Sequence, residues 1–228
     1  DHLDEAITLY EQVITDSIRV LGEDHRDTLT MHENLADTYV KAGRFDKAIA
    51  LYEQVITDRT RVLGEDHPDT LTSRHNLADT YRKAGRTGEA IALYEQVATG
   101  RARVLGPNYP DTLTSRHNLA NIYRSVGRLD EAITLYENLL PNHIRVLSAD
   151  HPDILASRND LAGAYESAGR LDEAIQLFEQ TFHDRIRVLG EDHPDTLASR
   201  NNLAGAYREA GRLGQAIALY EQVLPDRI

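Results

Sequence analysis

Histidine recurs at one spacing along this sequence, and imidazole is a common metal ligand. His25, His67, His151 and His193 occupy equivalent positions of a 42-residue period, and Tyr109 takes the remaining position. A metal site needs ligand atoms within about 2–2.2 Å of one ion, whereas residues one repeat apart on stacked helices are roughly 10 Å apart. The four imidazoles therefore cannot converge. We interpret them as helix caps, because each stands directly before a helical pattern and three of them precede a proline.

Arginine forms a second column, the term we use for residues at one repeat position. Its members lie on or beside an apolar helical stripe, and a buried guanidinium needs a carboxylate partner. The predicted partners are repeated glutamates, which would form an ion-pair ladder inside the array; direct ligand binding by the arginines is the alternative. The arginines are Arg74, Arg116, Arg158 and Arg200, with His32 in the first unit, and the glutamates are Glu53, Glu95, Glu137, Glu179 and Glu221.

Catalytic chemistry has no support in the remaining residues. The chain has no cysteine, which excludes thiolate catalysis and cysteine-ligated zinc or iron–sulfur sites. It has no nucleophile elbow and no glycine-rich phosphate loop, since its glycines mostly mark repeat boundaries. An active site would interrupt a repeat with one odd constellation of side chains, and no repeat is interrupted in this way. We therefore expect a protein that is not an enzyme, with no catalytic residue, no cofactor and no metal.

The elements that position these columns form a repeat of two helices. The segment from Val62 to Leu71 returns almost unchanged from Val188 to Leu197, and related copies begin every 42 residues. Within a unit, an apolar stripe at helical spacing ends at Gly85, and a second stripe follows. Two short helices cannot bury a core alone, but stacked pairs can. The sequence thus predicts an all-α solenoid of antiparallel helix pairs with about eleven helices.

The same period divides the chain into units. We expect a single repeat array over residues 1–228, in which 1–20 is the second helix of a truncated unit. Five units follow, over residues 21–62, 63–104, 105–146, 147–188 and 189–228. The unpaired helix predicts a fragment of a longer array. Pro141 and Pro225 share one column, and each predicts a bend in a second helix.

Composition limits the possible partners. Lys and Arg number 25 and Asp and Glu number 37, so the net charge is −12. This balance argues against non-specific binding to nucleic acid or to an anionic membrane, and no apolar run is long enough to span a bilayer. The absence of cysteine and of an opening signal peptide favours a reducing compartment, so we expect a cytoplasmic protein.

The repeat resembles the tetratricopeptide repeat, whose signature stands here as Leu77, Ala78, Tyr81, Gly85, Ala90 and Tyr94. The familiar repeat has about 34 residues, and this 42-residue form resembles the repeats of kinesin light chains and of long-repeat bacterial proteins. The resemblance implies a right-handed superhelix whose first helices line a concave groove. It also implies a scaffold that binds a protein or peptide, as the sensor or adaptor part of a larger protein. An excess of 22 Arg over 3 Lys favours a bacterial source.

Carried onto this chain, the groove of the family maps to one side of the first helices. Its asparagine column either holds a peptide backbone or forms hydrogen bonds between helices. Arg82 and Arg124 favour an acidic or carboxylate-bearing peptide. Gly163 and Gly205 indicate close approach by a ligand or by a packed neighbour, or else drift between repeats. The expected groove residues are Asn34, Asp37, Thr72, His75, Asn76, Asp79, Arg82, His117, Asn118, Asn121, Arg124, Asn159, Gly163, Asn201, Asn202, Gly205 and Arg208.

A second hypothesis for the function is structural. In it, the open ends of the array stack head to tail into dimers or filaments, because a heterologous contact need not close on itself. The resemblance does not choose between the two hypotheses, since one fold serves many functions.

Overall fold

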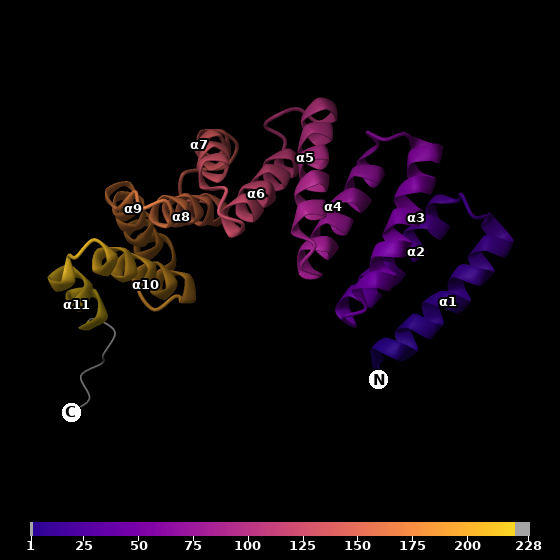
Figure 1. Ribbon diagram of the computed structural model, residues 1–228, viewed down its shortest axis with the longest axis horizontal. Coiled ribbons are helices and arrows are strands. Elements are labelled where there is room, and N and C mark those ends of the chain that lie inside the picture. Colours follow the sequence, from indigo (N-terminus) through magenta and orange to yellow (C-terminus); the bar gives the residue numbers. More distant parts are fainter. Residues whose placement is uncertain (1, 222–228) are drawn as a thin grey trace. The chain divides into compact units, whose positions relative to one another are not determined.

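The computed structural model describes residues 2–221, which form eleven helices and no strand (Figure 1). The helices follow one another as antiparallel pairs, so the all-α repeat array predicted from the sequence is confirmed. We call the even-numbered helices the first helices and the odd-numbered ones the second helices. Their bounds are α1 His2–Leu21, α2 Arg26–Lys41, α3 Phe45–Leu63, α4 Pro68–Lys83, α5 Thr87–Val104, α6 Pro110–Ser125, α7 Leu129–Val146, α8 Pro152–Ser167, α9 Leu171–Leu189, α10 Pro194–Glu209 and α11 Leu213–Glu221.

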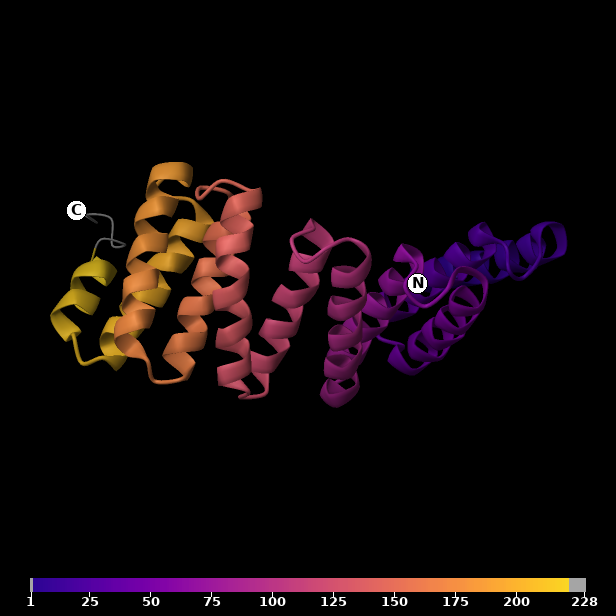
Figure 2. The same cartoon turned by 90° about the horizontal axis from the view of Figure 1, so that it is seen from above.

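The chain forms two compact units, residues 1–119 and residues 120–228. Within the first unit, each helix from α1 to α5 packs against the next helix in the chain, and within the second unit the same holds from α7 to α11. Figure 2 shows the helices of each unit lying side by side. A second helix such as α3 therefore contacts a first helix on either side of it in the sequence.

The histidine column caps the first helices. Nδ1 of His67 accepts a hydrogen bond from the backbone N–H of Asp69 at 3.1 Å, and Pro68 takes the first helical position. His25, His151 and His193 accept the equivalent bond, each at 3.2 Å. The predicted helix-cap role is therefore confirmed, and it explains why a histidine returns once per repeat without a shared ligand.

Gly85 shows how a first helix ends. Its φ of +76° lies in the left-handed region, where a residue with a Cβ is strained by about 1–2 kcal/mol. The backbone N–H of Arg86 then donates to the carbonyl oxygen of Tyr81 at 2.8 Å. The Arg86 guanidinium lies 4.5 Å from the centroid of the Tyr81 ring. The Gly-Arg pair thus reverses the chain and covers the tyrosine with a cation.

Alanine and tyrosine columns make the core. Ala78 is fully buried, and small residues at this position let neighbouring helices approach closely. Tyr52, Tyr94 and Tyr136 are each 1% exposed, so their rings fill the space between first and second helices. The ring columns are therefore packing elements, and their hydroxyl groups need hydrogen-bond partners within the array.

The proline column affects the fold less than its position suggests. Helix α7 runs without interruption through Pro141, so the predicted bend does not divide this helix. Pro225 lies outside the described residues.

Candidate binding surface on the first helices

The asparagine column joins neighbouring first helices. In the first unit, Nδ2 of Asn76 donates to Oε1 of Glu33 at 3.1 Å, and Nδ2 of Asn118 lies 3.4 Å from Nε2 of His75. In the second unit, Nδ2 of Asn202 donates to Oδ1 of Asn159 at 3.0 Å. The structure therefore shows the inter-helix hydrogen bond, which was one of the two roles left open by the sequence. These amide groups fix the spacing of the first helices.

Asn34 and Asn201 are exposed on α2 and α10, and Thr72 is exposed on α4. They present polar groups to solvent at three different repeat positions of the predicted groove.

The acidic positions of the predicted groove accept hydrogen bonds from second-helix tyrosines. The Tyr52 hydroxyl donates to Asp37, and the Tyr94 hydroxyl donates to Asp79. Burial, reinforced by the bound carboxylate, raises the pKa of both phenols far above its usual range, so they remain protonated donors. The tyrosine hydroxyl thus holds each carboxylate in a fixed orientation from the core side.

The same pairing changes in step along the second unit. The Tyr136 hydroxyl donates to Oδ1 of Asn121 at 2.6 Å. At the next repeat, phenylalanine (Phe178) takes the tyrosine position and glycine (Gly163) takes the acceptor position. A ring without a hydroxyl needs no acceptor, which is a physical reason for the smaller residue. The last unit does not follow this pairing, because Tyr220 and Gly205 take the two positions there.

Gly163 is buried because an arginine covers it. A Cβ built at this position would lie 2.6 Å from Nη1 of Arg124. Among the alternatives for this glycine, the structure therefore shows the packed neighbour. A Cβ at Gly205 would meet nothing within 4 Å, so no described neighbour explains that glycine.

An acidic residue lies close to Arg124. Burial and the neighbouring Glu209 raise the pKa of Glu166, while Arg124 and Arg208 act in the opposite direction. The predicted groove positions of the second unit therefore carry amide groups, guanidinium groups and glycines, and Glu166 adds an acidic group close to Arg124.

His75 is a largely enclosed titratable group of the predicted surface in the first unit, with a side chain that is 16% exposed. Its Nε2 lies 3.6 Å from Oδ2 of Asp79, and its ring meets the Tyr94 ring edge-on at 5.6 Å between centroids. Burial lowers the pKa of His75 more strongly than Asp79 raises it. The imidazole is consequently neutral at pH 7 and acts as a packing and hydrogen-bonding group. His117 lies at the next position of this column and is half-buried.

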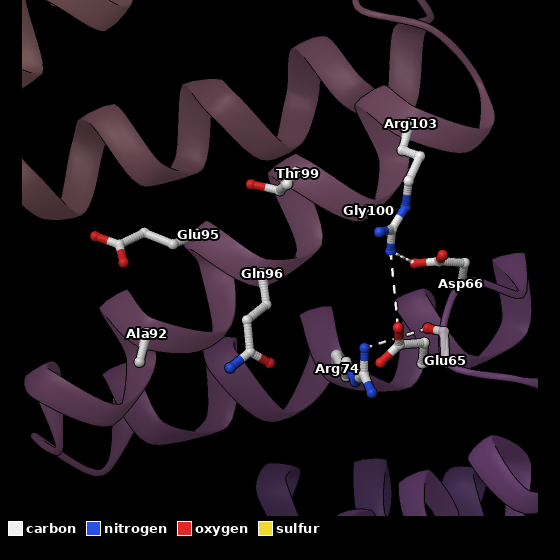
Figure 3. A pocket seen from close by; sticks show the side chains of 9 residues that line it. All are labelled: Glu65, Asp66, Arg74, Ala92, Glu95, Gln96, Thr99, Gly100 and Arg103. Atoms are coloured by element: carbon white, nitrogen blue, oxygen red, sulfur yellow. Dashed lines mark hydrogen bonds and ion pairs between the residues drawn. The ribbon is translucent and has the colours of Figure 1, made fainter.

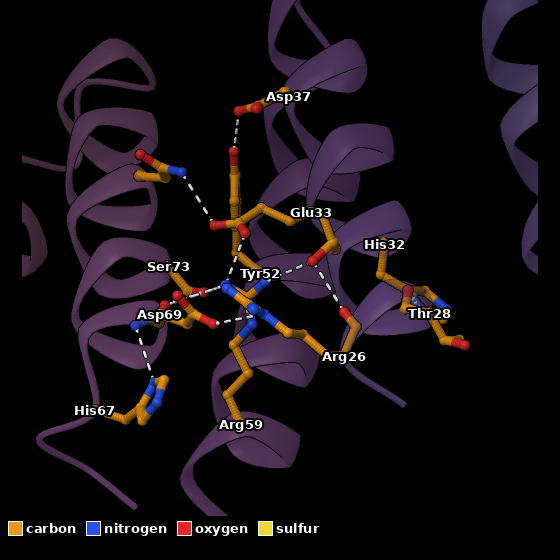
Figure 4. A network of polar contacts seen from close by, with 12 residues as sticks. Arg26, Thr28, His32, Glu33, Asp37, Tyr52, Arg59, His67, Asp69 and Ser73 are labelled. Atoms are coloured by element: carbon orange, nitrogen blue, oxygen red, sulfur yellow. Dashed lines mark hydrogen bonds and ion pairs between the residues drawn. The ribbon is translucent and has the colours of Figure 1, made fainter. Parts of the chain in front are cut away.

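A buried arginine in the second helices was missed by sequence reasoning (Figure 4). Arg59 is 3% exposed, and its Nη1 donates to Oε2 of Glu33 at 2.7 Å, to Oγ of Ser73 at 2.6 Å and to the Asp69 carbonyl oxygen at 3.1 Å. Arg185 repeats the last two contacts with Ser199 and Asp195 at 2.7 and 2.9 Å. The available signal was a serine 14 residues after each of these arginines.

The predicted arginine–glutamate ladder is wrong. The glutamates accept hydrogen bonds from first-helix tyrosines instead, as Tyr81 donates to Glu53 and Tyr165 donates to Glu137, both at 2.6 Å. Arg74 lies seven residues before Tyr81, or about 10 Å along the helix axis. In an antiparallel pair, that offset places the arginine near the opposite end of the second helix.

The arginine column instead has three different environments. Arg74 and Arg116 donate to the carbonyl oxygens of Glu65 and Pro107 at 3.2 and 3.3 Å. Arg158 donates to Asp184 at 2.6 Å, and the Arg200 guanidinium lies 5.6 Å from the Phe182 ring centroid.

The described residues contain no group of three or more His, Cys, Asp or Glu side chains placed to hold a metal ion. None of their helices combines the length and the apolar character that a bilayer crossing requires.

Comparison with known proteins identifies the repeat. A tetratricopeptide-repeat family model matches residues 2–59, 47–103, 89–137, 111–182 and 183–227. A kinesin light chain-like structure with nearly identical TPR-like repeats from Podospora anserina is 37% identical, with a TM-score of 0.79 over 87% of this chain and 94% of that chain.

Two more distant structures share the fold. BtubC (BKLC) from P. vanneervenii is 23% identical, with a TM-score of 0.81 over 97% of this chain and 89% of that chain. The MamA protein is 20% identical, with a TM-score of 0.60 over 89% and 91% of the two chains. No curated protein matches the chain.

Proposed function

Because the chain belongs to the tetratricopeptide-repeat family, in its kinesin light chain-like form, we propose that it is a non-enzymatic scaffold that binds a protein or peptide. Repeats of this family generally bind proteins. The proposed binding surface is the exposed side of the first helices, formed by the groove residues that the sequence predicts. We further propose that the scaffold is the sensor or adaptor part of a larger bacterial protein in the cytoplasm.

One observation carries this proposal, which is the repetition of accessible polar groups on the first helices. In the first unit, Thr72 and Arg82 are exposed ten residues apart on α4. In the second unit, Arg208 is exposed on α10 at the repeat equivalent of Arg82, and Asn201 is exposed at the repeat equivalent of His75. Regular spacing of this kind suits an extended or helical peptide, whose own groups repeat. The arginines favour a peptide that carries carboxylates.

The test first identifies a partner and then challenges the surface. Peptides that co-purify with the protein are identified by mass spectrometry, and their affinity is measured by calorimetry. Substitution of Arg82 and Arg208 by Ala is expected to weaken binding at least about tenfold, the loss typical of a charge-assisted contact. Arg145→Ala is the matched control, because Arg145 is an exposed arginine on the second helix α7. Unchanged affinity in the double variant, with unchanged circular dichroism, would reject this surface.

An alternative function is supported by exposed apolar side chains on the terminal helices described. Leu9 of α1 is 60% exposed, and Leu213 and Ile217 of α11 are 57% and 55% exposed. Contact between these faces in successive copies would give a head-to-tail assembly. Light scattering over a range of concentrations decides the matter. Growth in mass that Ile217→Asp abolishes supports assembly, and a monomer at the highest concentration excludes it.

A further inference from the structure

One repeat position of the second helices carries a carboxylate in α1, α3 and α9, and in α9 this carboxylate bridges two arginines. Asp184 in α9 accepts from Nη1 of Arg158 at 2.6 Å and from Nη2 of Arg187 at 3.1 Å. Arg187 also donates to Asp150 at 2.8 Å. In the first unit, Asp58 at the same position accepts from Arg61 at 3.1 Å. Oxygen atoms of the carboxylate thus neutralise guanidinium groups that lie along one side of the helix pair.

Gly100 takes this position in α5, and the bridge is missing there. Its two arginines are still present as Arg74 and Arg103, the repeat equivalents of Arg158 and Arg187. Arg103 pairs with Asp66, as Arg187 pairs with Asp150. Arg74 donates to the carbonyl oxygen of Glu65, and no carboxylate of the described residues pairs with it. The guanidinium is left half-buried with unused N–H donors.

The missing side chain coincides with a hollow of about 540 Å³ beside Gly100 (Figure 3). At its edge, the guanidinium groups of Arg74 from α4 and Arg103 from α5 both face Glu65, and a dashed line joins each of them to that residue. Gln96 and Thr99 add polar groups to the lining, and Glu65, Asp66 and Glu95 add carboxylates to it. The Glu65 carboxylate does not replace the bridge, because it is 66% exposed and lies 4.0 Å from Nη2 of Arg103.

We propose that the hollow beside Gly100 is a carboxylate-binding site, in which a ligand carboxylate takes the place that Asp184 holds in the second unit. Two guanidinium groups match the two oxygen atoms of a carboxylate in geometry and charge. The ligand is either a small carboxylic acid or an Asp or Glu side chain of another molecule. The site lies on α5 and the segment around the start of α4, and none of its lining residues belongs to the proposed peptide surface. It therefore does not depend on the proposed function.

The direct test is a titration with acetate, followed by nuclear magnetic resonance of the arginine Nε–Hε groups at constant ionic strength. We expect the Arg74 and Arg103 signals to shift and saturate with a Kd of about 1–10 mM, the range open to a ligand of few atoms. Arg158 and Arg187 are internal controls, because Asp184 already fills their site, and their signals should not move. Static signals of Arg74 and Arg103, or equal shifts at all four arginines, would overturn the proposal. Equal shifts with chloride would do the same.

Gly100→Asp provides the matched variant. A Cβ at Gly100 would lie 2.7 Å from Cδ2 of Leu71, so the leucine side chain must shift. Other units have a leucine at the same position together with the aspartate, as Leu29 with Asp58 and Leu155 with Asp184. The repeat can therefore accommodate an aspartate here. The variant is expected to abolish the acetate-dependent shifts of Arg74 and Arg103, and persistence of the shifts would contradict the site. A capped aspartyl peptide distinguishes the two possible ligands. If the peptide binds more tightly than acetate, the ligand is an Asp or Glu side chain of another molecule. If the two bind equally, the ligand is a small carboxylic acid.

Discussion

At the scale of single residues, the array is held together by polar groups inside it as well as by its apolar stripes. Arg59 brings a charge between α2, α3 and α4, where Glu33 balances it and the Asp69 carbonyl and Ser73 hydroxyl complete its hydrogen bonds. Glu33 also accepts from Asn76, so one buried carboxylate links three successive helices. Such a network tolerates little change, because each partner satisfies the others.

We predict that Arg59→Ala lowers the free energy of unfolding by about 3–5 kcal/mol, since it leaves the Glu33 carboxylate buried without its cation. Chemical denaturation followed by circular dichroism measures the loss. Arg61→Ala is the control, because this neighbouring arginine pairs with Asp24 on the exposed surface and its loss should be small. Equal losses in the two variants would show that the buried pair has no special weight.

His75 gives stability a dependence on pH. Burial lowers its pKa from the ordinary value of 6.5, so the unfolded chain binds the proton more readily than the folded one. The stability associated with the neutral ring is complete above pH 6.5 and is lost as the pH falls toward the lowered value. His75→Asn, which installs the residue found at the same repeat position as Asn159, should flatten this part of the profile. Denaturation between pH 7.5 and roughly 5 checks it, and parallel profiles would refute it.

At the scale of elements, capping and turn residues set where each helix of a pair begins and ends. A histidine cap with proline starts a first helix, and a glycine in the left-handed region ends it. These devices act within a few residues, so every repeat that keeps them folds into the same pair regardless of its surface. The regular register then leaves positions outside these caps and turns, such as Gly100, free to differ between repeats.

Two glycines three residues apart test this account. Gly85→Ala should lower the free energy of unfolding by about 1–2 kcal/mol, because Gly85 has a φ of +76°. Gly88→Ala should raise it by about 0.4–1 kcal/mol, since Gly88 is the second residue of α5, its φ is not positive, and a Cβ there meets nothing within 4 Å. Thermal denaturation of both variants gives the comparison. Changes of the same sign would show that backbone conformation does not govern this turn.

At the scale of the whole molecule, the stability of a repeat array is the sum of repeat and interface contributions. Among the described helices, α1 packs on α2 and α11 packs on α10, whereas α3 and α9 have a neighbouring helix on each side. A helix with one interface has less to lose on opening.

We therefore predict that amide protons of α1 and α11 exchange with solvent at least about tenfold faster than those of α3 and α9. Hydrogen–deuterium exchange with mass spectrometry on the intact chain measures this difference. Uniform protection along the chain would mean that the array opens as one cooperative body.

The sequence by itself determined the helices, their order and their ends, because caps, turn glycines and apolar stripes act over a few residues and recur every 42. It also determined that histidine was a capping residue, since a repeat separates equivalent side chains. Only the tertiary structure decided the partners of the polar columns. Asn76 and Glu33 are 43 residues apart, and Tyr81 and Glu53 are 28 apart. Which residues meet across such separations depends on how antiparallel helices align along their axes. For this reason the glutamates Glu53 and Glu137 accept hydrogen bonds from tyrosine hydroxyls. The arginines have other partners, and Arg74 donates to a backbone carbonyl oxygen.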